Sequence, residues 1–415
     1  MAKNASIPKW LMPAYPAGGL PKGGMMRRFT IAFFCVAFSI TIDAQQRRRT
    51  VDVGQPLPGL TAAQRAGFAD GLGEFTDIDT VDDGLGPVFN ERSCAACHTT
   101  PAVGGGSTRM VTRFARRVGG VFDPLTALGG SLIQDHAIGA TDGSPHTFSP
   151  ETVPPMATMV VHRRTTPLFG LGLVDATPDA DFVTLAQMEL ERGDGVAGRV
   201  NFVDNIRAGM KTAGKFGWKA QVPTLFQFAG DAYLNEMGIT TPDFPNENCP
   251  QGNCAELTFN PAPGINDDGG GPIALNDFMS MLAPPPRAQS RDSKDGEQIF
   301  ERLGCDSCHV PTLHTGSSVN AALDHKPYHP YSDFLLHDMG SLGDGLEMGS
   351  STGSEMRTAP LWGLRFVTAY LHDGRATTLD QAILAHDGQA RAARDRFAAL
   401  AANLKAKLIA FLQSL

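Results

Sequence analysis

Hydrophobic residues recur at the spacing of an α-helix in three segments of this 415-residue chain. The pattern is clearest at the C-terminus, where intervals of three and four residues place six apolar side chains on one face: Phe397, Leu400, Leu404, Leu408, Phe411 and Leu415. Two more helical patterns lie at 61–75 and 293–304. We therefore predict one helix in each of these three segments.

Alternating patterns typical of strands are rare between these segments. The chain contains 46 glycines and 29 prolines, which favour turns and loops over long regular elements. A Pro-rich and then charged stretch at 283–295 is typical of a linker. The sequence therefore predicts a mainly α fold with long loops and insertions, divided into a first half at 51–282 and a second half at 296–415.

The N-terminal segment 1–44 is set apart from this fold. Two arginines precede an apolar run at 29–42, and the small residue Ala44 follows, which is the outline of a secretory signal peptide. Translation would then start at Met25 or Met26, after an over-long gene start. A non-cleaved anchor is the alternative, but the run is short for one. We therefore expect a periplasmic or otherwise exported protein that is soluble once the signal is removed.

Charge and hydropathy exclude two classes of protein. The formal net charge of −8 and the pI near 5.8 argue against a nucleic-acid binder, which usually presents a basic face. No window of the sequence reaches the eighteen or so apolar residues that a membrane span needs. We expect no nucleic-acid partner and no stable membrane span.

Two phrases of the sequence occur twice, in the same order. Cys-x-x-Cys-His occurs at 94–98 and again at 305–309. RRTTPLFGLGL at 163–173 is similar to MRTAPLWGLRF at 356–366. The helical patterns described above precede the two cysteine motifs in the same way. Shared phrases in the same order indicate a duplicated unit.

Cys-x-x-Cys-His has the spacing required for covalent attachment of haem. Two cysteines three positions apart can each bond to a vinyl group of one porphyrin, and the following histidine then lies under the iron. Zinc is the alternative, but the two pairs lie much farther apart than in a zinc ribbon. We therefore expect two cytochrome c-like haem domains with proximal iron ligands His98 and His309. The attachment cysteines are Cys94, Cys97, Cys305 and Cys308.

Two more cysteines, Cys249 and Cys254, lie in the polar loop NENCPQGNCAE. In an oxidising compartment such a pair is typical of a local disulfide that staples the loop. Two free surface thiols are the alternative.

A second ligand for the second haem is indicated in the segment 372–390. Thr378 and Gln381 form the pattern of a capping box, and Gly388 is placed to end the helix. His386 then falls on the apolar face of this short helix. A packed core histidine is the default interpretation, but a nearby haem that lacks a ligand favours an iron ligand.

Several phrases together resemble the di-haem oxidoreductase family, whose members are described as peroxidases and sometimes as thiol oxidoreductases. The family is distantly similar to bacterial di-haem cytochrome c peroxidases and to the di-haem enzyme that matures methylamine dehydrogenase. The resemblance covers most of residues 55–415. The phrases are GPVFNERSCAACHTTPAVGGGS, RRTTPLFGLGLVDATPD, KFGWKAQVPTLFQFAGDAYLNEMGIT, YSDFLLHDMGSLGDG and RTAPLWGLRFVTAYLHDGRATTLDQAILAHDG.

The resemblance implies ligands for both irons. In the peroxidases a phrase similar to YLHDG…TLDQAI leads to a methionine ligand, and His386 stands at that position, so the second haem would be bis-histidine, His309/His386. No histidine follows His98 closely, so the first haem is expected to be open or water-bound. Four residues remain as candidate caps for it: Met110, His136, His146 and His162. The HDMG stretch at 337–340 is expected to be structural.

Peroxide chemistry also needs a base that takes a proton from the peroxide and returns it. Glu236 in YLNEMG is the candidate that the resemblance indicates, with Glu189 and Glu191 as competitors. Trp218 and Trp362 are candidate electron relays between the haems, although each could simply pack in the core.

The expected function is that of an exported di-haem c-type oxidoreductase. It would reduce hydrogen peroxide or a related oxidant at an open N-terminal haem, with electrons relayed through a bis-histidine C-terminal haem. The donor would be a small cytochrome, a cupredoxin or a quinol pathway. The alternatives are a di-haem electron-transfer cytochrome without catalysis and a haem oxygenase acting on an organic substrate. A calcium ion between the domains, as in some relatives, is left open.

Overall fold

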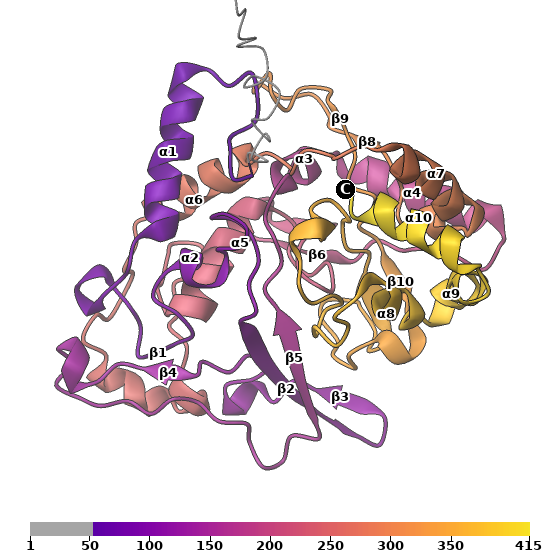
Figure 1. Cartoon of the computed structure of the whole chain (residues 1–415). Coiled ribbons are helices and arrows are strands. Elements are labelled where there is room, and N and C mark those ends of the chain that lie inside the picture. The colour runs from indigo at the N-terminus through magenta and orange to yellow at the C-terminus, as the bar shows by residue number, and fades with distance from the viewer. Residues whose placement is uncertain (1–52) are drawn as a thin grey trace, which may run out of the picture. The chain divides into compact units, whose positions relative to one another are not determined.

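Two helices, α1 (Ala62–Thr76) and α6 (Gly270–Met281), pack against each other beside the first cysteine motif in the computed structural model, which describes residues 53–415 (Figure 1). Thr61 caps α1: its hydroxyl accepts a hydrogen bond from the Gln64 N–H, and the Gln64 side chain accepts one from the Thr61 N–H. The predicted helix at 61–75 is therefore confirmed. The predicted signal segment at 1–44 lies outside the described residues.

The close approach of α1 and α6 depends on Gly71. A Cβ atom at Gly71 would lie 2.0 Å from the Ala274 carbonyl oxygen of α6, whereas a Cβ at Gly73, two positions along the same helix, would meet nothing within 4 Å. Phe75 and Phe278, with ring centroids 4.8 Å apart, continue the contact towards the cysteine motif. The sequence of α1 thus sets the distance between two helices that support the first site.

Gly71→Ala is expected to destabilise the protein by about 1–3 kcal/mol, because the new methyl group must push α6 away. Gly73→Ala is the matched control, since it also replaces a glycine in α1 but points to open space. It is expected to stabilise by about 0.5–1 kcal/mol. Urea unfolding of both variants measures the difference, and equal effects of the two substitutions would contradict this account of the packing.

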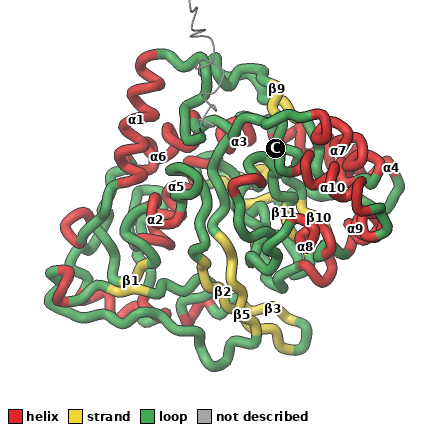
Figure 2. Tube along the Cα trace, in the orientation of Figure 1, coloured by secondary structure: helices red, strands yellow, loops and turns green. Residues whose placement is uncertain are grey.

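The other helices range from 4 to 14 residues, and long irregular segments connect them (Figure 2). They are α2 (Cys94–Cys97), α3 (Leu171–Asp175), α4 (Asp179–Arg192), α5 (Leu225–Ala232), α7 (Arg291–Arg302), α8 (Leu379–Leu384), α9 (Arg391–Ala398) and α10 (Ala402–Leu412). The predicted helix at 293–304 is confirmed as α7.

Small antiparallel sheets are a larger part of the fold than the sequence indicated. The longest strand, β2 (Met110–Val118), pairs with β5 (Met159–Arg164) in a register that joins Met110 to Arg164, and with β3 (Val121–Asp123). The expectation of a mainly α fold is therefore met only in part. The strands were missed because β2 carries arginine and threonine among its apolar residues and lacks a clean alternation.

Four two-stranded sheets complete the described strands. They are β1 (Val88–Phe89) with β4 (His136–Ala137), β6 (Phe202–Asn205) with β7 (Met210–Ala213), β8 (Leu313–His314) with β9 (Pro327–Tyr328), and β10 (Leu336–Asp338) with β11 (Glu355–Arg357).

The C-terminal apolar pattern forms two helices, so the prediction of one helix was wrong. α9 ends at Ala398 and α10 begins at Ala402, because Ala401 is extended, with φ −61° and ψ 147°. Phe397 and Phe411 are both fully buried in one cluster with Phe300 of α7. Helical periodicity continued across the break because both helices turn their apolar faces to this cluster.

The described residues, 53–415, belong to one compact unit. The predicted linker at 283–295 overlaps α7, which begins at Arg291. Beyond this, the division into two haem domains stays a prediction. Within the described residues, no helix is both long and apolar enough to cross a membrane.

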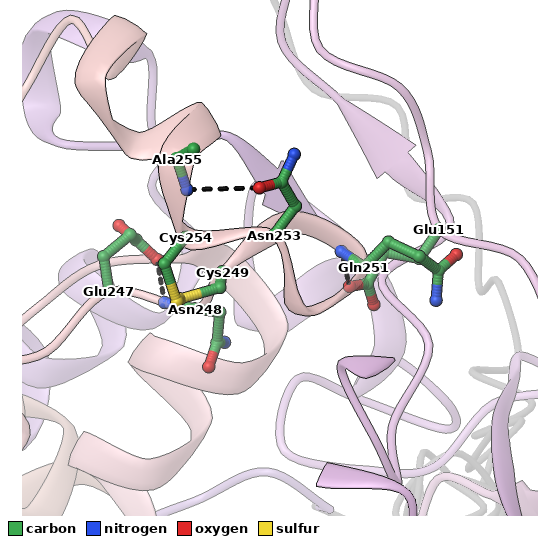
Figure 3. The surroundings of a disulfide bond; sticks show 8 residues. All are labelled: Glu151, Glu247, Asn248, Cys249, Gln251, Asn253, Cys254 and Ala255. Atoms are coloured by element: carbon green, nitrogen blue, oxygen red, sulfur yellow. Dashed lines mark hydrogen bonds between the residues drawn. A yellow bond between two sulfur atoms is a disulfide. The ribbon is translucent and has the colours of Figure 1, made fainter. Parts of the chain in front are cut away.

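Cys249 and Cys254 are joined by a disulfide in the loop between α5 and α6 (Figure 3). The Gln251 N–H, between them, donates a hydrogen bond of 2.7 Å to the Glu151 carboxylate, so the loop is tied to a distant segment. Asn253 accepts a hydrogen bond from the Ala255 N–H and caps the following turn.

Candidate haem-binding sites

The first cysteine motif forms its own short helix, α2. The His98 N–H donates to the Cys94 carbonyl at 3.0 Å, so the histidine follows directly at the end of this turn. Burial raises the pKa of the Cys94 thiol and of the Cys97 thiol to about 12. An environment that disfavours thiolates suits sulfur atoms that carry no charge, as thioether bonds to a porphyrin require.

The imidazole of His98 is oriented by one hydrogen bond. Its Nδ1–H donates to the Gly105 carbonyl at 3.0 Å, which leaves Nε2 with a lone pair. Burial lowers the pKa of His98 to about 4, so the ring is neutral. The ring of Phe75 contacts it edge-on at 5.9 Å. A neutral imidazole held at Nδ1 is the form in which histidine binds a metal.

The second cysteine motif repeats this arrangement on a 3₁₀ turn, Cys305–Ser307. The Nδ1–H of His309 donates to the Tyr331 carbonyl at 2.9 Å, and burial lowers the pKa of His309 to about 4. Burial also raises the pKa of Cys308. The two motifs therefore present the same chemistry in two places.

His386 faces His309. The two ring centroids are 6.4 Å apart, and the Nδ1–H of His386 donates to the Ala382 carbonyl at 2.8 Å, which leaves its Nε2 free as well. Two imidazoles that bind one metal ion through bonds of about 2 Å have centroids roughly 6 Å apart. The pair thus fits a six-coordinate iron.

The local structure around His386 differs from the prediction in two details. Helix α8 ends at Leu384, so His386 follows the helix instead of lying on its face. The Thr378 hydroxyl caps the Gln381 N–H as expected, but the Gln381 side chain accepts from Thr377, so the capping box is incomplete. After Leu384 the chain tightens, since the His386 N–H donates to the Ile383 carbonyl, three residues back, at 3.2 Å.

His337, in the HDMG stretch, has both ring nitrogens engaged. Nδ1 lies 2.7 Å from Gln389 Oε1, and Nε2 lies 2.9 Å from Asp333 Oδ2. The ring is 1% exposed and its Nδ1 also lies 3.5 Å from Cys308 Sγ. His337 therefore differs from His309 and His386, which each have a free Nε2, and it has no ring nitrogen available to bind iron.

A cavity that is partly open to solvent lies beside the first motif. Its wall contains Cys94 and Cys97 together with Arg113, Trp218 and Glu236. The residues around this cavity therefore fit a haem group attached at α2.

Glu236 lies on a π-helical turn, η4 (Tyr233–Met237), a rare geometry that occurs frequently at functional sites. Burial raises the pKa of its carboxyl group, and the Asn90 side-chain amide donates to it at 2.7 Å. The two competing carboxylates lie elsewhere: Glu189 is buried beside His337, and Glu191 is exposed on α4.

None of the four candidate caps for the first haem lines this cavity. His136 contacts Asp135, His146 contacts Glu256, and His162 lies beside Thr112. Met110 begins β2. The cavity wall contains instead Met237, which is 3% exposed and which the sequence gave no reason to select. Its position next to Glu236 in the sequence was the only feature that could have indicated that Met237 lines this cavity.

A second cavity lies beside the first and shares Trp218 with it. The indole N–H of Trp218 donates to the Arg164 carbonyl at 3.0 Å, and its backbone carbonyl accepts from the Arg357 N–H at 2.9 Å. Trp362 lines only the second cavity and packs against Tyr328. The structure therefore places Trp218, but not Trp362, on both cavities.

Several solved structures resemble this one distantly, whereas no protein of curated function matches the chain in sequence. The diheme peroxidase BthA from Burkholderia thailandensis is 14% identical, with a TM-score of 0.39, over 88% of this chain and 87% of that chain. Hydrazine synthase from Kuenenia stuttgartiensis is 14% identical, with a TM-score of 0.38, over 87% and 90%. A MauG-like protein associated with microbial copper homeostasis is 17% identical, with a TM-score of 0.30, over 53% and 79%.

A protein-family model gives the clearer assignment. The model described as "Di-haem oxidoreductase, putative peroxidase" matches residues 155–415. The match contains the second cysteine motif, His386, Glu236 and both copies of the second repeated phrase, at 163–173 and 356–366. It begins after the first motif, so it is shorter than the expected resemblance over 55–415. Because it spans more than half of the sequence, the chain belongs to the di-haem oxidoreductase family.

Proposed function

We propose that this protein reduces hydrogen peroxide with electrons from an external donor, using one reactive haem and one electron-storing haem. The observation that carries the proposal is an asymmetry between the two motifs. His386 faces His309 across a gap that fits one iron, whereas the wall of the cavity beside the first motif contains no histidine. His98 would hold a haem with an accessible side, and His309 with His386 would hold a saturated one.

When bound, haem at these sites would supply two irons that exchange single electrons, one of them accessible to peroxide. The reaction H₂O₂ + 2 e⁻ + 2 H⁺ → 2 H₂O also requires proton transfer. Side chains of the protein would carry out this transfer. Glu236 is placed to accept a proton from one peroxide oxygen and return it to the other. Its raised pKa, caused by burial, brings the carboxyl group closer to the range in which it can do both.

Trp218 is the proposed contact between the two sites. Its side chain is fixed by the hydrogen bond to Arg164, and its backbone is fixed by the hydrogen bond to Arg357, so both copies of the repeated phrase hold it. An aromatic ring held rigidly between two redox groups provides a short path for electrons. Trp362 has no such double anchor and is proposed to pack in the core.

The second candidate function is electron transfer without catalysis. Met237 favours it, because a buried thioether in the wall of the first cavity could occupy the sixth position of the first iron. Peroxide would then find no open position there. The coordination of the first haem therefore decides between the two functions.

Low-temperature electron paramagnetic resonance of the oxidised protein, beside the His386→Ala variant, tests the proposal. We expect one high-spin and one low-spin ferric signal in the wild type. His386→Ala should change only the low-spin signal, because it removes one of the two imidazoles of the second site.

His337→Ala is a suitable control, because His337 is a buried histidine near the second motif without a free ring nitrogen. It should leave the low-spin centre six-coordinate. Two low-spin signals and no high-spin signal in the wild type would support the electron carrier instead, unless reduction of the protein opens one site.

Export remains part of this proposal. It is supported by the apolar run at 29–42 in the sequence and by the disulfide Cys249–Cys254, a bond that persists in oxidising compartments. A small cytochrome, a cupredoxin or a quinol pathway of the same compartment would supply the electrons.

A further inference from the structure

Two arginines at matching positions of the repeated phrase line the second cavity. Arg164 stands before Thr-Thr-Pro-Leu-Phe-Gly and Arg357 before Thr-Ala-Pro-Leu-Trp-Gly. Arg164 also lines the first cavity. The repeated phrase has therefore placed two cationic side chains beside one cavity, and one of them also reaches the cavity beside the first motif.

The guanidinium group of Arg164 has no hydrogen bond and no ion pair with residues 53–415. Its backbone is well anchored, since its N–H donates to the His372 carbonyl at 2.7 Å and its carbonyl accepts from the Trp218 indole at 3.0 Å. Burial lowers the pKa of Arg164, so the charged group is poorly solvated. The backbone is thus fixed while the charge points into a cavity without a counter-ion.

Arg357 is more deeply buried, with 7% of the residue exposed. Its Nε donates to the Gly217 carbonyl at 2.7 Å and its Nη1 to the Thr358 carbonyl at 3.0 Å, but no described carboxylate lies within ion-pair distance. Burial lowers its pKa to about 10. These neutral acceptors orient the guanidinium group without balancing its charge.

Two other buried cations of the same protein are balanced. Arg163, next to Arg164, contacts Asp344 at 2.6 Å, and Lys219 contacts the other oxygen of Asp344 at 3.2 Å, all three being nearly inaccessible. A buried charge without a partner costs several kcal/mol. Two unbalanced arginines beside one cavity therefore indicate that the cavity receives anions.

We propose that Arg164 and Arg357 bind carboxylates of the haem propionate groups. Guanidinium groups bind carboxylates through two parallel, charge-assisted hydrogen bonds, which fix orientation as well as position. The two arginines are positioning residues, since they would fix the position of a porphyrin and add positive charge near its iron. The inference rests on the haem sites proposed above.

The test uses the haem-loaded protein with Arg164→Gln, a substitution that removes the charge but breaks no hydrogen bond of the guanidinium group. A nearby cation favours the ferrous form, because it offsets the added electron. Arg164→Gln is therefore expected to shift the midpoint potential of at least one haem to a lower value in a potentiometric titration. Arg164→Lys keeps the charge and should therefore have a midpoint potential close to that of the wild type.

Arg207→Gln is the matched control. Arg207 is also held by its neighbours, pairing with Asp243 at 2.9 Å and stacking on Phe226, but its side chain is 57% exposed and lines neither cavity. Its loss should leave both midpoint potentials unchanged. Unchanged potentials in Arg164→Gln, in a protein that carries two haems by pyridine haemochrome assay, would overturn the inference. A protein without haem would overturn the proposed function instead.

A carboxylate could also come from an organic substrate, and benzoate serves as the probe for that source. If propionates occupy the arginines, benzoate should not change the Soret spectrum of the wild type. A saturable spectral change that Arg164→Gln abolishes would assign the arginines to a free anion and overturn the inference. A crystal structure of the loaded protein gives the direct check, with propionate oxygens expected within hydrogen-bond distance of Arg164 and Arg357.

Discussion

Glu236→Gln is expected to lower kcat/KM for peroxide reduction by about 10²- to 10⁴-fold, the range typical of losing a general acid–base group. The amide is nearly the same size as the carboxyl group and keeps an oxygen that can accept the hydrogen bond from Asn90. It cannot take a proton from peroxide and return it. The loss should therefore fall on catalysis, with both haems and their paramagnetic resonance signals retained.

Glu191→Gln is the control for this prediction, because Glu191 is a glutamate on the exposed side of α4. It should react with peroxide at the wild-type rate. Rates are measured by stopped-flow absorbance at several peroxide concentrations. A Glu236→Gln variant that retained the full rate would remove Glu236 from the reaction and direct attention to the other polar side chains of the same cavity, such as Arg113.

The double substitution Cys94→Ala/Cys97→Ala is expected to leave only one covalently bound haem, at the second motif. Both thioether bonds to the first porphyrin would be absent, and the buried imidazole of His98 alone would hold it weakly. Peroxide reduction should be lost and the low-spin signal of the second haem retained. Mass spectrometry of the denatured protein and the pyridine haemochrome assay count the haems directly.

Cys249→Ala/Cys254→Ala is the matched control, since it removes a second pair of cysteines from the same half of the chain. It should retain both haems and lose about 2 kcal/mol of stability, the amount expected for opening a short loop. If Cys94→Ala/Cys97→Ala still carried two covalent haems, the assignment of the first motif would be wrong.

Local chemistry in this protein was predictable because it depends on neighbours along the chain. The spacing of Cys94, Cys97 and His98 is complete within one turn, and the structure adds only the carbonyl of Gly105 that orients the imidazole. The cap of α8 is also local: the Thr378 hydroxyl accepts the predicted hydrogen bond from the Gln381 N–H, although the reciprocal half of the capping box is absent. The strands β2 and β5 were missed because what makes them strands is pairing with a distant partner.

The candidate caps of the first haem show the limit of such reasoning. Each of Met110, His136, His146 and His162 has a suitable side chain, but whether it reaches the cavity depends on how β2, β4 and β5 are placed. The structure turns all four away and brings Met237 in. A ligand that lies far from its motif along the chain is fixed only by packing.

The sequence by itself determined that this chain carries two Cys-x-x-Cys-His motifs in a duplicated framework, since residue spacing and repeated phrases can be read without coordinates. Only the tertiary structure decided what surrounds them. It placed His386 opposite His309, Glu236 beside the first motif, Trp218 on both cavities and two unbalanced arginines beside the second cavity. These relations join segments that are far apart along the chain, and such contacts are set by the packing of the whole fold, which no local pattern encodes.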